Sequence, residues 1–245
     1  MKLSREITNI IRFILDNLVP PIVRDSKLFM WLPFKLLFKD KSNLFFSFKE
    51  KINNLNTSQI AEIYKKTFDV HIDRQTDLNS ESIRKILNEL EGDSVLDVGC
   101  GSGYLIRLIE NDFKVTGLDF CKSPDYHIIN NGTSFIEADA TTLPFKDNSF
   151  DTVICAHTLE HIVDIYKAIK ELKRVCKKKL IIIVPKQKPY KYTFDLHLHF
   201  FPYEYSLLIL MNNIKVKPSI NSIETIKGDL FYKEEFNDVT KAKFK

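Results

Sequence analysis

The sequence contains few glycines and cysteines, and it lacks any long apolar run. Seven glycines and nine prolines among 245 residues exclude a collagen-like or low-complexity chain. The four cysteines show no C-x-x-C spacing, so neither a zinc knuckle nor a disulfide framework is expected. No run reaches the ~18 apolar residues of a membrane span, and the N-terminus lacks a signal-peptide core. We therefore expect a cytoplasmic protein with reduced thiols.

The charge of the chain is small overall but unevenly distributed. A formal net charge of +4 does not by itself indicate a nucleic-acid partner, and no RNA-binding module is visible. Residues 1–51 hold ten Lys/Arg and five Asp/Glu, a local charge of +5, which leaves −1 for the rest. With 44% hydrophobic and 28% charged residues, the composition is typical of one large globular domain with an appendage.

The N-terminal region is rich in aromatic residues. Apolar residues recur at helical spacing from Ile7 to Leu18, which predicts an amphipathic helix that ends before Pro20. Seven of the 19 phenylalanines and the only tryptophan lie in the first fifth of the chain. We favour a helical lid whose aromatic side packs on the core, because exposed apolar stripes are uncommon in soluble chains. The alternative is a peripheral membrane contact through residues 5–48, with aromatics at the lipid interface and lysines near lipid phosphates.

A glycine-rich turn lies between a strand pattern and a helix pattern near the middle of the sequence. Ser94–Val98 predicts a buried strand interrupted by Asp97, and Tyr104–Ile109 begins a helical pattern. Three alternating glycines separate the two, at Gly99, Gly101 and Gly103. A turn of this kind directs backbone N–H groups at a ligand, and no Cβ atom blocks the approach.

The acid and the glycine spacing limit the ligand of this turn. A dinucleotide site needs G-x-G-x-x-G, but here the third glycine comes one residue early and Tyr104 occupies the last glycine position. A phosphate-binding loop needs Gly-Lys-Ser/Thr, which the turn lacks. Asp97 would repel a pyrophosphate, whereas it suits a ligand with a cationic amine or sulfonium. A nicotinamide-dependent oxidoreductase is therefore disfavoured.

Two motifs resemble those of a known enzyme family. D-V-G-C-G-S-G, residues 97–103, resembles the first motif of the class I S-adenosylmethionine (SAM) methyltransferases, in which the acid serves the methionine end of SAM. A-D-A-x-x-L-P-F-x-D-x-S-F-D, residues 138–151, is similar to the third and fourth motifs of the type 11-like small-molecule branch of that family. The resemblance covers residues 80 to about 185.

Asp119 has the position of a ribose-binding acid. It ends the second predicted strand and lies 20 residues after Gly99, the spacing of such acids in βαβ nucleotide sites. By the resemblance, Asp139 binds the adenine amino group, the Ala140 N–H binds an adenine ring nitrogen, and Ala156 lies beside the methionine moiety. The predicted SAM-binding residues are Asp97, Gly99, Cys100, Gly101, Asp119, Phe120, Asp139, Ala140 and Ala156.

Strand and helix patterns alternate from Ser94 onward, which predicts an α/β fold. The resemblance implies a doubly wound, mostly parallel sheet of seven strands with an N-terminal helical appendage. The predicted domains are an appendage or lid at residues 1–78, a SAM-binding domain at 79–233 and a charged tail at 234–245. Strands are predicted at residues 94–98, 114–118, 134–138, 152–156, 179–184, 214–216 and 229–232, and helices at 58–68, 80–90, 104–109, 167–177 and 202–211.

Four of the six histidines fall in two short stretches, H-T-L-E-H and D-L-H-L-H. Ligands of open α/β sheets lie beyond the carboxyl ends of the strands, so these stretches supply the candidates for the acceptor side. The predicted catalytic residues are His157, His161, His197 and His199. The H-x-x-E-H spacing would place two histidines one turn apart in a helix, which leaves open a divalent metal. Its candidate ligands are His157, Glu160, His161 and His199.

The sequence thus predicts a SAM-dependent methyltransferase. We expect transfer of a methyl group to an oxygen or nitrogen of a small molecule, a glycan or a lipid precursor. The lysines and tyrosines of residues 186–193 suit an anionic or sugar-like acceptor. A non-catalytic SAM-binding or scaffold protein is the first alternative, and a nicotinamide-dependent oxidoreductase is the second. The expected location is the cytoplasm, with membrane association if the N-terminal region contacts lipid.

Overall fold

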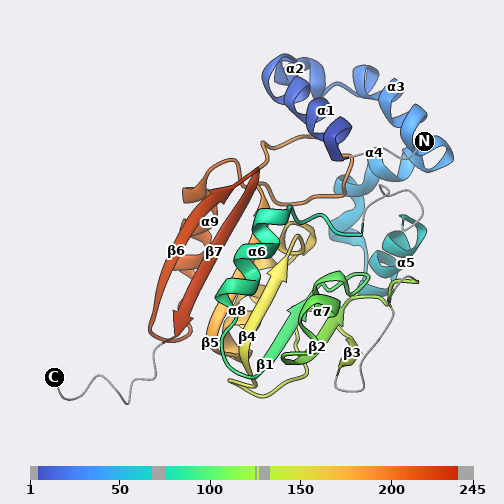
Figure 1. The fold of residues 1–245 in the computed structure, drawn as a ribbon. Coiled ribbons are helices and arrows are strands. Elements are labelled where there is room, and N and C mark those ends of the chain that lie inside the picture. The colour runs from blue at the N-terminus through green and yellow to red at the C-terminus, as the bar shows by residue number, and fades with distance from the viewer. Residues whose placement is uncertain (1–4, 68–74, 125, 127–132, 237–245) are drawn as a thin grey trace. The chain divides into compact units, whose positions relative to one another are not determined.

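The computed structural model describes residues 5–67, 75–124, 126 and 133–236, and it divides the chain into two compact units (Figure 1). The helical unit comprises Met1–Gln75 and Lys188–Phe200. The sheet unit comprises Thr76–Gln187 and Phe201–Lys245. The SAM-binding domain predicted from the sequence includes residues 188–200, whereas the structure groups this segment with the N-terminal helices.

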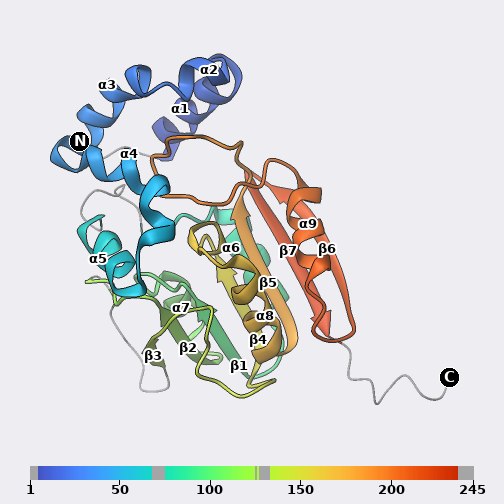
Figure 2. The ribbon, with the colours of Figure 1, turned by 180° about the vertical axis from the view of Figure 1, so that it is seen from behind.

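A seven-stranded sheet with the order β3-β2-β1-β4-β5-β7-β6 is the frame of the sheet unit (Figures 1 and 2). The strands are β1 (Ser94–Val98), β2 (Lys114–Asp119), β3 (Ser134–Glu137), β4 (Phe150–Ala156), β5 (Cys176–Pro185), β6 (Ser219–Ile226) and β7 (Asp229–Phe236). Strands β1 to β5 pair in parallel, and β7 pairs antiparallel with both β5 and β6. The predicted fold class is confirmed.

The order of the strands reverses between β1 and β4. The chain runs outward from β1 through β2 to β3, and then returns to place β4 on the other side of β1. At such a reversal the connections leave toward opposite faces of the sheet, and a crevice opens beyond the carboxyl ends of the two strands. A ligand is expected at this place.

Helices cover both faces of the sheet because alternate strand residues point to opposite sides. On one face Leu180 and Ile182 of β5 pack with α8 and α9, and on the other Ile181 and Ile183 pack with α6 and α7. Figure 1 shows α6 and α7 in front of the sheet, and Figure 2 shows α8 and α9 in front of it. These helices are α6 (Ser80–Glu89), α7 (Tyr104–Ile109), α8 (Ile165–Val175) and α9 (Glu204–Asn213).

The helical unit has an aromatic core of its own. Phe38 stacks on Phe45 with ring centroids 3.7 Å apart, and Phe34 stacks on Phe46 at 4.5 Å. Tyr192, from the later segment, makes an edge contact with Phe46 at 5.1 Å. The helices of this unit are α1 (Arg5–Asn17), α2 (Pro21–Arg24), α3 (Lys27–Phe38), α4 (Ser42–Lys51) and α5 (Thr57–Thr67), with 3-10 turns at Lys39–Lys41 and Ile52–Asn54. Within the described ranges, no helix combines the length and apolar character that crossing a membrane requires.

Three predicted elements differ from the structure. The strand predicted at residues 214–216 is wrong, because the edge strand β6 begins only after Pro218, which has no N–H to donate to a ladder. The helix predicted at residues 167–177 ends at Val175, where β5 begins. The predicted tail starts inside β7, which buries Glu234, and residues 237–245 lie outside the described residues.

Candidate active site

The carboxyl ends of β1, β2 and β4 bring polar groups together at the reversal of strand order. Asp97 is the penultimate residue of β1, Asp119 is the last residue of β2 and Ala156 is the last residue of β4. The parallel pairing of β1 with both neighbours aligns these strand ends along one edge of the sheet. Asp139 follows shortly after β3, the next strand along that edge.

The glycine turn after β1 packs tightly against protein at its first glycine and borders open space at its second. Gly99 has a φ of +77°, and a Cβ atom there would lie 1.9 Å from Thr158 Oγ1. Gly101 has a φ of +53°, and a Cβ atom there would meet none of the described residues within 4 Å. The turn therefore packs against the loop after β4 at Gly99, whereas its backbone borders open space at Gly101.

Asp119 connects the end of β2 to the glycine turn. Its Oδ2 accepts a hydrogen bond from the Gly101 N–H at 2.8 Å, and its Oδ1 accepts one from the Cys121 N–H at 3.4 Å. Burial raises the pKa of Asp119, and the backbone donors oppose this rise. Because each carboxylate oxygen has two lone pairs, Asp119 can still accept hydrogen bonds from a ligand diol.

Asp97 is a buried carboxyl group beside the same turn. Its side chain is 3% exposed, and burial together with the negative charge of Asp119 raises its pKa to about 7. Near neutral pH, Asp97 therefore exists in both protonation states. A ligand with a positive charge at this edge would favour the ionised form.

The other predicted cofactor residues lie in the turns around these two acids. Asp139 Oδ1 accepts a hydrogen bond from the Thr141 N–H at 2.8 Å, which fixes the turn that contains the buried Ala140. Burial, and then the charges of the neighbouring acids, raise the pKa of the Cys100 thiol, so this group stays protonated. Phe120 is half-buried directly after β2.

His157 is a half-buried residue directly after β4 that lies between two carboxylates. Its Nε2 lies 3.3 Å from Asp229 Oδ1, and its Nδ1 lies 3.5 Å from Glu160 Oε1. Burial by itself lowers the pKa of His157, but its pairing with Asp229 and then Glu160 outweighs this effect and raises the pKa to about 10. A protonated imidazole accepts no further proton at neutral pH, so we interpret His157 as an orienting group rather than a general base.

Sequence reasoning missed the partner network of His157. Asp229 Oδ2 accepts hydrogen bonds from Asn79 Nδ2 at 2.6 Å and from Ser82 Oγ at 2.7 Å. The Asn79 side chain also caps α6 by accepting the Ser82 N–H at 2.8 Å. An asparagine before a helical pattern is a typical N-cap, so Asn79 could have been found from sequence. No local signal connects His157 with Asp229, which is far away along the chain.

Comparison with known families shows which family the glycine turn and the neighbouring strand ends belong to. Residues 96–184, which include the glycine turn and the ends of β2 and β4, match the family model described as a methyltransferase domain. Residues 96–184 of the sheet unit form a class I SAM-dependent methyltransferase domain. The family uses SAM as the methyl donor, in agreement with the motifs of the sequence.

Several relatives of the methyltransferase domain are named for quinones. The 2-phytyl-1,4-naphtoquinone methyltransferase of Synechocystis sp. is 37% identical over 109 residues, which cover 38% of this chain and 44% of that protein. The demethylmenaquinone methyltransferase of Staphylococcus epidermidis is 26% identical over 217 residues, 80% of this chain and 89% of that protein. The chain spans about half the length of the naphthoquinone methyltransferases it matches.

A solved structure shares the fold of the methyltransferase domain. A SAM-dependent methyltransferase from Aquifex aeolicus superposes with a TM-score of 0.51 at 20% sequence identity. The superposition covers 74% of this chain and 98% of that chain. It supports the doubly wound architecture of the sheet unit.

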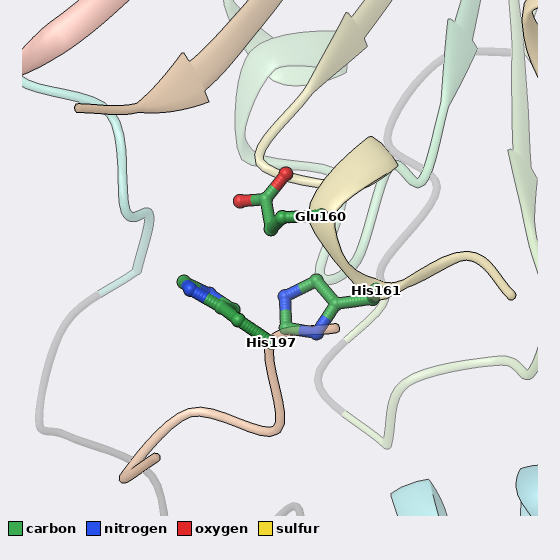
Figure 3. Close-up of side chains that lie close together, drawn as sticks. All are labelled: Glu160, His161 and His197. Atoms are coloured by element: carbon green, nitrogen blue, oxygen red, sulfur yellow. The ribbon is translucent and has the colours of Figure 1, made fainter. Parts of the chain in front are cut away.

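The four predicted catalytic histidines are divided between the two units. Figure 3 shows the side chain of His161 beside that of Glu160, both on the same side of the 3-10 turn η3 (Leu159–His161) that follows β4 of the methyltransferase domain. His197 and His199 belong to the helical unit. There the buried His197 places Nδ1 3.3 Å from Asp195 Oδ2.

Of the residues proposed from sequence as metal ligands, His157 does not fit that role. His157 has a φ of +49° and precedes η3, so the H-x-x-E-H spacing does not form the helical turn that was expected. Both ring nitrogens of His157 face carboxylates, so its imidazole presents no lone pair to a metal. His199 belongs to the other unit. We therefore derive no step through a metal.

Proposed function

We propose that this chain transfers a methyl group from SAM to a small-molecule acceptor. The observation that carries the proposal is a pair of acids, the buried Asp97 and the half-buried Asp119, at adjacent strand ends beside a glycine turn that borders open space. SAM supplies a methyl group that its positive sulfur already activates. The protein then has to hold donor and acceptor in line, with the reacting atoms about 3–3.5 Å apart.

The residues at the strand ends divide the binding of SAM among them. Asp119 accepts hydrogen bonds from the ribose hydroxyls, and Asp97 pairs with the ammonium group of the methionine moiety. The backbone from Gly99 to Gly101 passes close to the ligand because Gly101 borders open space. Asp139 and the Ala140 N–H bind the adenine, while the cofactor-binding residues that complete the site are Cys100, Phe120 and Ala156.

The acceptor side requires a group that handles a proton. An oxygen or nitrogen acceptor loses a proton when it is methylated, so a nearby base assists the transfer. His161 is the candidate base of the methyltransferase domain, and the protonated His157 orients the loop after β4. His197 and His199 are the candidates that the helical unit supplies.

The acceptor that we propose has an apolar ring body, and reduced quinones, in which a ring hydroxyl accepts the methyl group and loses its proton, are the first class to test. The support for this choice is the named substrates of the naphthoquinone and demethylmenaquinone relatives. Glycans and lipid precursors, which the sequence also suggested, are the alternative acceptors. The region that matches the relatives best is the SAM-binding domain, which binds the methyl donor. A direct experiment therefore has to distinguish the acceptor classes.

The test is an activity assay of the full chain with isotopically labelled SAM. Quinones, their reduced forms, sugar phosphates, lipid extracts and total RNA are offered separately, and labelled products are identified by mass spectrometry. We expect label in the fractions that contain reduced quinones. SAM binding without label in any fraction would instead support a non-catalytic SAM-binding protein. Calorimetric binding of NAD in place of SAM would overturn the proposal in favour of an oxidoreductase.

SAM affinity is expected to rise with pH as Asp97 ionises. With a pKa of about 7, Asp97 is mostly protonated at pH 6 and mostly ionised at pH 8, and only the ionised form pairs with the ammonium group of SAM. The association constant measured by calorimetry should therefore be about fivefold higher at pH 7 than at pH 6, a range in which the ammonium group of SAM stays mostly protonated. An Asp97→Asn variant should lose this dependence. If the association constants of parent and variant change in parallel with pH, Asp97 is not the titrating group.

A further inference from the structure

Helix α1 is oriented with its polar side toward the rest of the helical unit. Asp16 accepts a hydrogen bond from the Tyr190 hydroxyl at 2.5 Å and lies 3.7 Å from the guanidinium of Arg24. Arg12 lies 4.0 Å from Asp195. In a surface helix of a globular protein it is usually the apolar side that faces inward. The polar contacts of α1 therefore hold its apolar side outward.

The outward side of α1 is apolar, and the short helix α2 continues it. Phe13 is 62% exposed, and Leu18, directly after α1, is 68% exposed. Ile22 of α2 is 85% exposed, whereas Arg24 of the same helix is buried and donates a hydrogen bond to the Pro189 carbonyl at 3.1 Å. In both helices the described charged groups are thus less exposed than these apolar side chains.

Helix α3 adds a second apolar row. Leu28, Leu32 and Leu36 recur every four residues, so they lie on one side of the helix, and they are 88%, 56% and 67% exposed. The opposite side carries Phe34 and Phe38, which are buried in the aromatic core with α4. The leucine row is therefore not required for the packing of the helical unit.

The helices that carry these exposed side chains lie at one end of the helical unit. Figures 1 and 2 both show α1, α2 and α3 grouped at the end of the unit that lies away from α5. We call the exposed apolar side chains between Ile10 and Leu36 the apolar face. Many exposed apolar side chains on neighbouring helices indicate a contact with another molecule or a membrane.

The charges around the apolar face are mostly positive. Across residues 10–41 the exposed charged side chains are Lys27, Lys35, Lys39 and Asp40, which gives a net charge of +2. Lysines beside exposed leucines, with Trp31 half exposed among them, are the composition of surfaces that lie in the interface of an anionic bilayer. A second copy of the chain is disfavoured as the occupant, because a symmetric contact would bring the same lysines toward each other.

We propose that the apolar face docks the protein onto the surface of an anionic phospholipid bilayer. The apolar side chains enter the boundary between headgroups and acyl chains, and the lysines contact lipid phosphates. The proposal does not depend on methyl transfer. If the acceptor is a quinone with a long apolar chain, the docked enzyme would meet it where it resides.

Vesicle flotation of the full chain tests this proposal. The vesicles contain equal parts of phosphatidylglycerol and phosphatidylcholine, and vesicles of phosphatidylcholine alone are the comparison. We expect the protein to float with the anionic vesicles, less with the neutral ones, and less at high salt because the lysine contacts are screened. A double variant, Leu28→Glu with Leu32→Glu, should lower the partition coefficient at least tenfold, which is about 1.4 kcal/mol.

A matched control carries the same chemical change on the sheet unit. Ile209 and Ile220 are 57% and 68% exposed, so Ile209→Glu with Ile220→Glu adds the same charge without touching the apolar face. This control should float like the parent. Equal loss of flotation in both double variants, or no flotation of the parent, would overturn the proposal.

Two further measurements distinguish membrane docking from misfolding and from self-association. SAM affinity measured by calorimetry should be the same in the parent and both double variants, which shows that the fold is intact. Sedimentation without vesicles should give a monomer, whereas a dimer that only the Leu28→Glu and Leu32→Glu variant abolishes would assign the face to a second copy. Failure of methyl transfer in the activity assay would leave the flotation result unchanged, so the two proposals fail independently.

Discussion

Replacing Asp119 with alanine is expected to weaken SAM binding at least tenfold, which corresponds to about 1.4 kcal/mol. The carboxylate is the proposed acceptor for both ribose hydroxyls, and hydrogen bonds to a charged acceptor contribute about 1.5–3 kcal/mol each. The substitution also removes the acceptor of the Gly101 N–H, so the glycine turn loses a support. Isothermal titration calorimetry of the purified full chain measures the loss.

Two companion variants make the result specific. Asp119→Asn keeps an oxygen that can accept the Gly101 N–H but loses the charge, so we expect an affinity between those of the parent and the alanine variant. Asp112→Ala removes an exposed acid from the loop after α7 and should bind SAM like the parent. The ribose role would be contradicted by an Asp119→Ala protein whose affinity equals that of the Asp112→Ala control.

Replacing His157 with asparagine is expected to lower the free energy of unfolding by about 3 kcal/mol or more. The imidazolium is the cation between two nearly inaccessible carboxylates, Asp229 and Glu160, which are 2% and 0% exposed. Removing it takes away the positive charge that faces both carboxylates, although Asp229 keeps its hydrogen bonds from Asn79 and Ser82. Asparagine is the chosen replacement because it tolerates the positive φ of this position. Urea unfolding at neutral pH, followed by circular dichroism, gives the free energy.

The pH dependence of this effect follows from the raised pKa of His157. Its folded pKa of about 10 lies above its ordinary value of 6.5, so its stabilisation is complete below pH 6.5 and is lost as the pH rises through about 10. The stability difference between parent and variant should narrow from pH 7 to pH 10. A double variant with both His157→Asn and Asp229→Asn should recover part of the lost free energy of unfolding, because it also removes one of the two negative charges. A single variant as stable as the parent would show that His157 is uncharged.

The parallel sheet and the glycine turn could be predicted because their signals are local. The strands from β1 to β5 are apolar runs, and the turn after β1 is defined by glycine spacing within a few residues. Asp119 was found in the same way, by its distance from Gly99 along one βαβ unit. The edge strand β6 was misplaced because its exposed, polar sequence gives no apolar pattern.

The environment of His157 could not be predicted because it depends on contacts that are distant in sequence. The H-x-x-E-H spacing suggested a helical turn, but His157 adopts a left-handed backbone conformation and pairs with Asp229 of β7. The side of α1 that faces inward could not be predicted from the sequence either. Its periodicity predicted an apolar side correctly, but only tertiary contacts such as that of Asp16 with Tyr190 decide which side faces inward.

The helical unit is assembled from two separate stretches of chain, and this limits how the protein can be dissected. Tyr192 of the second stretch packs on Phe46 of the first, so a truncation at Gln75 would strip Lys188–Phe200 of its aromatic partners. In the remaining protein these residues would lose the aromatic core on which they pack. Transfer of the helical unit to another protein would accordingly require both stretches together.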